Sequence, residues 1–279
     1  MEAVVISWLS RLFRSNSNGA NSDVGVGIFE VSSKPDHPLS FGYKVGWFAV
    51  ATEDVALVAR VLGLVGVQVA NWQTGLKLAV KTNLLSGNPD RKVFLTPPLN
   101  GWILVVGGEL PYPAELSGRD VDFNAITNRF DYLMLRLSSH FHEVQYFASH
   151  RVSDSVTWTR RTERMYRSFT YADGWVYLNR GSQTKEEREL GMPDLTGMGQ
   201  QAATDEIFGL LEKQQAEVDA LCNSGLSRKE ALQRLRRSAM PSETNVTELA
   251  GLWSLDPCQI EEHFHDLSTG LLGELRFDR

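Results

Sequence analysis

Apolar residues recur at two different periods along this chain, and the change of period divides it into regions. From about residue 24 to residue 190, short apolar runs typical of strands alternate with segments in which apolar residues recur every three to four positions. The runs predict strands at 25–31, 42–52, 64–72, 143–152, 155–161, 167–172 and 175–181, and two strands joined by a turn within 91–111. The helical period predicts helices at 53–64 and 123–141.

Beyond residue 203 the helical period dominates. One helix, beginning near residue 204, carries an apolar stripe made by Ile207, Leu210, Leu211, Val218 and Leu221. Ser227 and Glu230 have the spacing of a capping box for the next helix. Asp256 followed by Pro257 is a favourable helix start, because proline fits the first helical position. The C-terminal part is therefore expected to be helical.

These patterns predict an α+β protein, with a mixed sheet and packed helices followed by a helical C-terminal part. The expected parts are an N-terminal helix with a linker (1–23), an α+β domain (24–190), a linker or mobile loop (191–203) and the helical part (204–279). Gly46-Trp47 and Gly101-Trp102 each open an apolar strand that precedes a helix and a further apolar strand. This echo suggests a duplicated strand–helix–strand unit, with a chance match as the alternative.

The first residues predict a short amphipathic helix. Its apolar residues recur at helical spacing and are Val5, Trp8, Leu9, Leu12 and Phe13. It suits docking on its own domain, with contact to a membrane surface or a partner as the alternative. A secretory signal has its positive charge before the apolar run, whereas Arg11 and Arg14 come late, and no run approaches the ~18 apolar residues of a membrane span. We therefore expect a cytoplasmic protein.

Composition narrows the classes of partner. The chain has 279 residues, a formal net charge of −6 and a pI near 5.6, whereas nucleic-acid-binding domains are normally basic. We therefore expect no direct contact with nucleic acid, and the acidic balance mildly favours a basic protein partner. The two cysteines, Cys222 and Cys258, lack metal-ligand spacing, which favours a reducing compartment without disulfide bonds.

Half of the six histidines lie close together, at His140, His142 and His150. If residues 141–148 form a strand, His140 and His142 face one side, as two metal ligands must. His150, however, lies about 26 Å further along a continuous strand, and Glu143 points to the other face. No HExxH motif, GxSxG elbow or phosphate-binding glycine loop is present in the sequence. Structural histidines are the favoured interpretation, and a metal-dependent hydrolase using this region is the alternative.

Short acidic clusters are the other candidates for a site. The predicted partner-binding residues are Glu186, Glu187, Glu189, Asp205 and Glu206. Neighbouring carboxylates on helices are typical of solvated first turns, and they also suit an interface that steers a basic protein toward the chain. The segment 227–238 is basic instead. It favours a solvated helix face, and together with the N-terminal helix it leaves an adaptor protein as a further alternative.

Five stretches together carry a resemblance to a known family: GYKVGWFAVATEDVALVARVLGL, VFLTPPLNGWILVVGG, FHEVQYFASHRVSDSVTW, TKEERELG and LAGLWSLDP. They run from about residue 42 to 257 and resemble a family of largely uncharacterised bacterial proteins. They are also similar to the immunity protein that guards a pseudomonad against its own type VI secretion nuclease effector. The stretches carry no catalytic signature, so no functional residue is carried over. The resemblance implies a cytoplasmic inhibitor that binds a toxin stoichiometrically.

We therefore expect a non-catalytic immunity protein that binds and neutralises a cognate secreted toxin. No cofactor, metal, catalytic residue or stable membrane insertion is expected. Two modes of inhibition are open: covering the active-site cleft of the toxin, or blocking its assembly.

Overall fold

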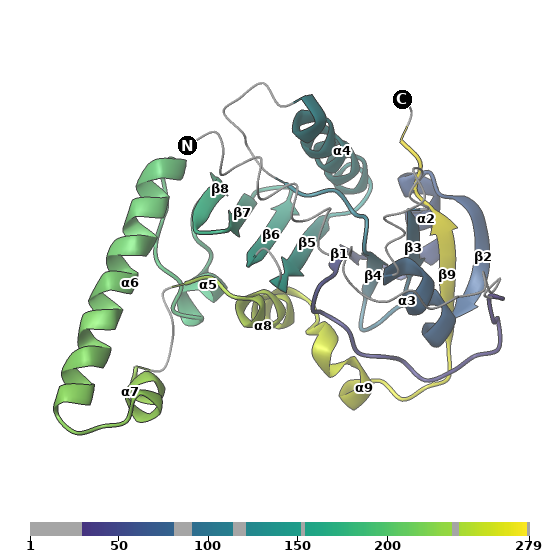
Figure 1. Ribbon diagram of the computed structural model, residues 1–279. Helices are drawn as coiled ribbons and strands as arrows, with labels where there is room; N and C mark the ends of the chain where they lie inside the picture. The colour runs from purple at the N-terminus through teal and green to yellow at the C-terminus, as the bar shows by residue number, and fades with distance from the viewer. Residues whose placement is uncertain (1–29, 81–90, 114–120, 152–153, 236–239, 278–279) are drawn as a thin grey trace, which may run out of the picture.

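The computed structural model describes residues 30–80, 91–113, 121–151, 154–235 and 240–277, with the side chains of 121–127 left out (Figure 1). The strands are β1 Gly46–Ala51, β2 Val65–Asn71, β3 Lys92–Leu95, β4 Trp102–Gly107, β5 Glu143–His150, β6 Ser155–Thr162, β7 Tyr166–Ala172, β8 Trp175–Arg180 and β9 Thr269–Glu274. The helices are α2 Val55–Leu62, α3 Trp72–Val80, α4 Val121–Ser138, α5 Lys185–Glu189, α6 Gln200–Asn223, α7 Arg228–Arg234, α8 Glu243–Trp253 and α9 Ile260–His263, with a 3₁₀ turn η2 at Pro257–Gln259.

The nine strands form one sheet in the order β2-β9-β3-β4-β1-β5-β6-β7-β8. This confirms the α+β class. The predicted mixed sheet is corrected in one respect, because every neighbouring pair among the described strands is antiparallel. The hairpin between β7 and β8 turns at Asp173 and Gly174, whose positive φ angles of 47° and 81° suit a tight hairpin turn.

Helices cover both faces of the sheet, because successive side chains of a strand point to opposite sides. On one face Phe48 of β1 packs with Phe130 of α4 and with Tyr146 of β5. On the other face Trp47 stacks on Phe147, and α3, α8 and the first half of α6 add their apolar residues. Both layers are visible in Figure 1, with α4 above the sheet and α8 below it.

The C-terminal part is helical as predicted, but it ends in a strand, β9, that the sequence pattern does not predict. β9 lies inside the sheet, between β2 and β3, with Leu272 opposite Phe94 and Gln68. Gly270 is required there, since a Cβ at this position would lie 2.0 Å from the carbonyl oxygen of Leu95. The predicted α+β domain and the predicted helical part therefore share one sheet. The last strand, β9, belongs to the helical part in sequence but completes the sheet of the α+β domain.

The suggested duplication is present in element order but not in position. β1-α2-β2 and β4-α4-β5 both occur, and α2 packs against α4. In the sheet, however, β1 lies between β4 and β5, whereas β2 is an edge strand. The two tryptophans are not equivalent, because Trp47 pairs with Val106 of β4 while Trp102 pairs with Ala51 at the far end of β1.

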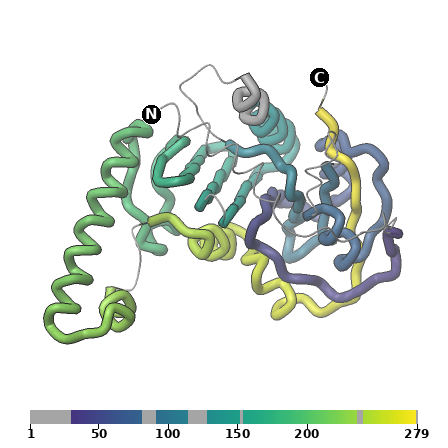
Figure 2. The backbone as a smooth tube through the Cα atoms, in the orientation of Figure 1, coloured from purple at the N-terminus to yellow at the C-terminus, as the bar shows by residue number. Residues whose placement is uncertain are grey.

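The two edges of the sheet differ. At β8, α6 supplies side chains to the outer backbone groups: Val176 donates its N–H to Thr204 Oγ1 at 3.0 Å, and Gln200 Nε2 donates to the Tyr177 carbonyl oxygen at 2.6 Å. At β2, the segment of residues 30–45 passes only the end of the strand before running below the sheet toward β1 (Figure 2). The edges at β8 and β2 lie at opposite ends of the molecule (Figure 1).

Side chains cap several helix ends. Ser227 forms the predicted capping box with Glu230, Thr184 forms a second one with Glu187, and Gly63 ends α2 in the left-handed conformation. The N-cap of α2 is Asp54, whose own N–H donates to the hydroxyl of Thr52.

Several predictions concern the start of the chain. The expected helix and linker at 1–23 lie outside the described residues, as does most of the expected strand 25–31, of which the last two residues are described and are not in a strand. Within the described ranges, none of the helices is both long enough and apolar enough to cross a membrane.

Candidate functional site

The histidine cluster is spread over two ends of β5. His140 and His142 lie in the turn after α4, before β5 begins, and both are exposed. Nδ1 of His140 lies 3.0 Å from the carbonyl oxygen of Arg136, so the ring caps the end of α4. His150 is at the far end of β5, where burial and the nearby Lys44 lower its pKa. The predicted separation of His150 from the other two is therefore observed.

Glu143 is engaged by neighbours that hold it away from the histidines. Its Oε1 accepts hydrogen bonds from Nε of Arg160 and from Nε2 of Gln145, each at 2.7 Å. The Arg160 guanidinium also lies over the ring of Trp253, 5.5 Å from the ring centroid. Across the parts of the chain that the structure describes, no three His, Cys, Asp or Glu side chains gather as a set of metal ligands. The arrangement therefore gives no support to the hydrolase alternative.

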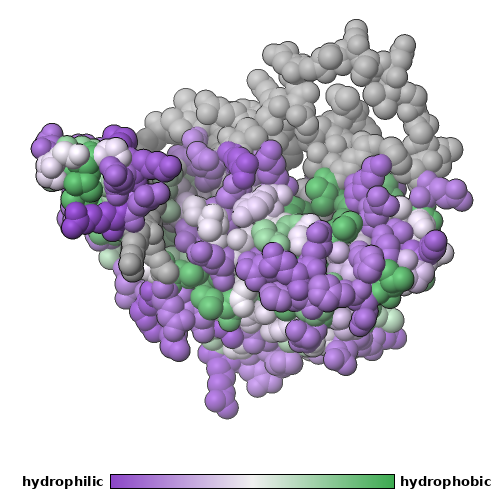
Figure 3. All heavy atoms as spheres, turned by 90° about the horizontal axis from the view of Figure 1, so that it is seen from below, coloured by the Kyte–Doolittle hydropathy of each residue, from purple (hydrophilic) through white to green (hydrophobic). Residues whose placement is uncertain are grey.

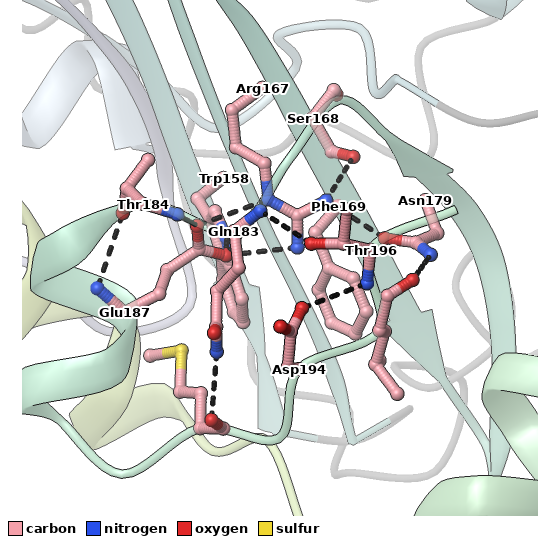
Figure 4. Close-up of polar contacts among 12 residues, drawn as sticks. Trp158, Arg167, Ser168, Phe169, Asn179, Gln183, Thr184, Glu187, Asp194 and Thr196 are labelled. Carbon is pink, nitrogen blue, oxygen red and sulfur yellow. Dashed lines mark hydrogen bonds and ion pairs between the residues drawn. The ribbon is translucent and has the colours of Figure 1, made fainter. Parts of the chain in front are cut away.

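Glu187, one of the predicted partner-binding residues, is buried in the structure, where a partner does not reach it. Its side chain is 1% exposed and forms an ion pair at 2.9 Å with Arg167, which is 4% exposed (Figure 4). Trp158 Nε1 and the backbone N–H of Thr184 donate to the same carboxylate at 2.8 and 2.7 Å. Burial of the carboxylate is compensated by three hydrogen-bond donors from different elements, namely Trp158 of β6, Arg167 of β7 and Thr184 at the N-cap of α5. Arg167, on β7, is likewise buried.

The buried pair is linked to the segment 191–199, which lies within the predicted linker or mobile loop 191–203. Arg167 NH1 donates to Asn179 Oδ1 at 2.8 Å, and Asn179 Nδ2 donates to the carbonyl oxygens of Leu195 and Met198 at 2.7 and 3.0 Å (Figure 4). Gln183 Nε2 adds two more bonds to carbonyl oxygens of this segment. The segment is irregular but fixed by side chains of β8 and of the turn that follows it.

This fixation predicts an effect of Asn179→Ala. The variant removes three partly buried hydrogen bonds, those of the Asn179 amide with the carbonyl oxygens of Leu195 and Met198 and with the Arg167 guanidinium, which lowers stability by about 1–3 kcal/mol. We expect faster cleavage within 191–199 by a low concentration of protease, measured by mass spectrometry of the fragments. Gln201→Ala is the matched control, since this exposed amide bonds only to exposed Asp205. Equal cleavage of both variants would contradict the role of Asn179.

The four other predicted carboxylates lie at the surface, on two helices. Glu186 is partly buried and accepts from Trp253 Nε1 at 3.3 Å, and Glu189 pairs with Lys185 at 3.1 Å on the same helix. Asp205 and Glu206 are exposed near the start of α6. Of the predicted set, the α6 pair is the part that remains available to a partner.

α6 carries a larger acidic surface than the predicted pair Asp205 and Glu206. The helix contains five acidic side chains and one lysine, and it projects with α7 from the side of the body, where its surface is largely hydrophilic (Figures 1 and 3). Positions seven residues apart share a face of a helix. One such solvent-facing row, which we call the acidic row, consists of Asp205, Phe208, Glu212, Gln215 and Asp219, all exposed.

The acidic row has features of a contact surface. It extends over about 21 Å, from the rise of 1.5 Å per residue. Phe208 is 47% exposed and rests against Gly174 of the β7–β8 turn, so its ring is held in place at the surface. No ion pair joins the carboxylates of the row to a Lys or Arg among the described residues. The periodicity was readable from the sequence, but the exposure of Phe208 was not.

Comparison of the chain with protein-family models, with curated proteins and with solved structures gives no match.

Proposed function

We propose that the protein is a non-catalytic immunity protein that binds and neutralises a cognate secreted toxin, a nuclease effector of type VI secretion, in the cytoplasm. The acidic row of α6 is the observation that supports this proposal. A nuclease has to present lysine and arginine side chains to the phosphates of DNA. A row of carboxylates that form no ion pair within the described parts of the chain is complementary to such a surface, and charge complementarity raises association rates and selects partners.

The form of the row adds to this support. Exposed carboxylates alone give little affinity, because surface ion pairs contribute about 0–1 kcal/mol each. Aromatic side chains at the centre of an interface carry much more, often above 1 kcal/mol when truncated. Phe208 lies between Asp205 and Glu212 on the same face, so an apolar anchor is flanked by the steering charges.

A pair of charge reversals tests the proposed function. The double variant Asp205→Lys/Glu212→Lys is expected to weaken binding to the toxin by roughly tenfold or more, mainly through a slower association rate. The toxin is found by affinity capture from the host and mass spectrometry, and is then produced separately. Its cleavage of plasmid DNA is measured with increasing amounts of immunity protein. The wild-type protein should abolish cleavage at an equimolar ratio.

The control uses exposed carboxylates outside the acidic row and outside the predicted set, on α6 and α8. Glu217→Lys/Glu248→Lys changes the net charge of the protein by the same amount but leaves the acidic row intact, so inhibition should persist. If both double variants inhibit equally poorly, net charge and not the row determines binding. If the wild-type protein leaves every captured nuclease active, the immunity function itself is refuted.

A further inference from the structure

The surface of the acidic row continues onto α7, the helix that projects from the body together with α6 (Figure 1). Arg228 Nη2 donates a hydrogen bond to Gln215 Oε1 at 3.2 Å, and Gln215 is a member of the row. Leu232 follows Arg228 by four residues, so both side chains lie on the side of α7 that adjoins the row. Leu232 is 49% exposed, and Arg228 is exposed as well. One exposed face therefore spans both helices.

The two parts of this face carry opposite charge. α6 contributes the carboxylates of the acidic row, whereas α7 begins with Arg228 and Lys229, both exposed. The carboxylate of Glu230 is engaged at the start of α7, where it accepts hydrogen bonds from the N–H and the hydroxyl of Ser227 at 2.9 and 2.6 Å. Within the described ranges, no ion pair joins Arg228 or Lys229 to a carboxylate. A partner that covers the face therefore meets negative charge from α6 and positive charge from α7.

The acidic row alone is too small to hold a stable partner. A stable complex buries about 800 Å² on each partner, contributed by roughly 20–30 residues. Much of its affinity comes from a few anchor side chains, most often aromatic residues and arginine. Phe208 on α6 and Arg228 on α7 are of these kinds, and Leu232 adds apolar area beside Arg228. A tightly bound toxin is therefore expected to contact both helices.

The mixed charge of the face narrows the surface of the toxin that fits it. A uniformly basic surface would suit the carboxylates of α6 but would place like charges against Arg228 and Lys229, which is unfavourable. The active-site cleft of a metal-dependent nuclease carries both signs. Carboxylates in it hold the divalent cation, and lysine and arginine side chains beside them bind the phosphates of DNA. This pattern is the reverse of the one on α6 and α7.

We propose that α6 and α7 fill the active-site cleft of the toxin, with the acidic row against the phosphate-binding side chains and Arg228 against the catalytic carboxylates. This mode of binding rests on the proposed function, and of the two modes of inhibition it is the one that covers the cleft. DNA and the immunity protein then exclude each other from the toxin.

The first test uses the full chain, the captured toxin and a phosphorothioate duplex DNA, which resists cleavage. Binding of the immunity protein to the immobilised toxin is measured by surface plasmon resonance at increasing concentrations of the duplex. The apparent affinity is expected to fall in proportion to the fraction of toxin that holds DNA. Simultaneous binding of DNA and immunity protein to one toxin molecule would overturn the proposal and leave the immunity function intact.

The second test is a pair of double variants. Arg228→Glu/Leu232→Ala is expected to weaken binding to the toxin by roughly tenfold or more. Arg234→Glu/Leu252→Ala is the matched control, because it changes the same residue types at exposed positions, on another side of α7 and on α8, and it should bind like the wild-type protein. Circular dichroism establishes that each variant is folded. Equal binding by the two double variants would overturn the proposal, whereas a wild-type protein that inhibits no captured nuclease would refute the proposed function.

Discussion

Glu187→Ala is expected to lower the free energy of unfolding by about 3–5 kcal/mol, the usual cost of removing one partner of a buried ion pair. The variant leaves the Arg167 guanidinium charged inside the protein, and Trp158 Nε1 and the Thr184 N–H lose their acceptor. Urea unfolding measures the change, and an unaltered dependence on urea concentration would show that the variant unfolds from a comparable structure.

Two further variants separate the buried pair from the helix that carries it. Glu189→Ala removes an exposed carboxylate of α5 that pairs with Lys185, and the free energy of unfolding should change by less than about 0.5 kcal/mol. Replacing both Arg167 and Glu187 by methionine should cost less than Glu187→Ala alone, because no unpaired charge remains. A double variant as unstable as the single one would mean that the bonds to Trp158 and Thr184, and not the ion pair, dominate.

Leu272→Ala is expected to lower the free energy of unfolding by about 2–5 kcal/mol, the range for truncating a buried leucine. Leu272 is 1% exposed and lies in β9, with the core residues Trp72 and Phe94 in the same apolar cluster. The loss combines missing apolar contacts with a cavity that the rigid sheet cannot close. Thermal unfolding followed by circular dichroism gives the comparison with the wild-type protein.

Leu267→Ala provides the contrast, since Leu267 is 60% exposed and lies two residues before the start of β9. Its truncation should change the free energy of unfolding by no more than about 0.5 kcal/mol. If Leu272→Ala also had so small an effect, β9 would not be an interior strand of the sheet.

The elements with strong local signals were predictable from the sequence. Asp173-Gly174 forms a tight hairpin turn, and Thr184 and Ser227 cap helices through side chains a few residues away. These features depend on neighbours in the sequence, so the pattern of residue types is sufficient. The α+β class follows in the same way, because strand-like and helical periods alternate before residue 190.

Features that depend on distant contacts were not predictable. The segment that forms β9 is short and contains Gly270 and Gly273, which locally disfavour a strand, and only pairing with β2 and β3 makes it one. Glu187 likewise differs from Glu186 only in position along the helix. It is buried because Arg167 and Trp158 reach it from strands some 20 to 30 residues earlier.

The candidate site shows the same limit. The seven-residue spacing of Asp205, Glu212 and Asp219 can be read from the sequence, and it places them on one side of a helix. Which side meets the sheet depends on Ile207 and Ala203 packing into the core, and that is a tertiary contact. The histidines show the reverse case, since the separation of His150 from His140 and His142 follows from the rise of a continuous strand and was predictable.

The position of β9 sets an order of events during protein synthesis. β2 and β3 emerge from the ribosome early, but the strand that joins them is the last of the nine to be made. Domains begin to fold from the N-terminal side while the chain grows. The edges of β2 and β3 that face β9 therefore stay unpaired until β9 has been made. A chain that stops before residue 269 keeps those edges, which are templates for aggregation. We therefore expect truncated copies to be insoluble and to be removed by proteases, so that only chains translated through β9 accumulate.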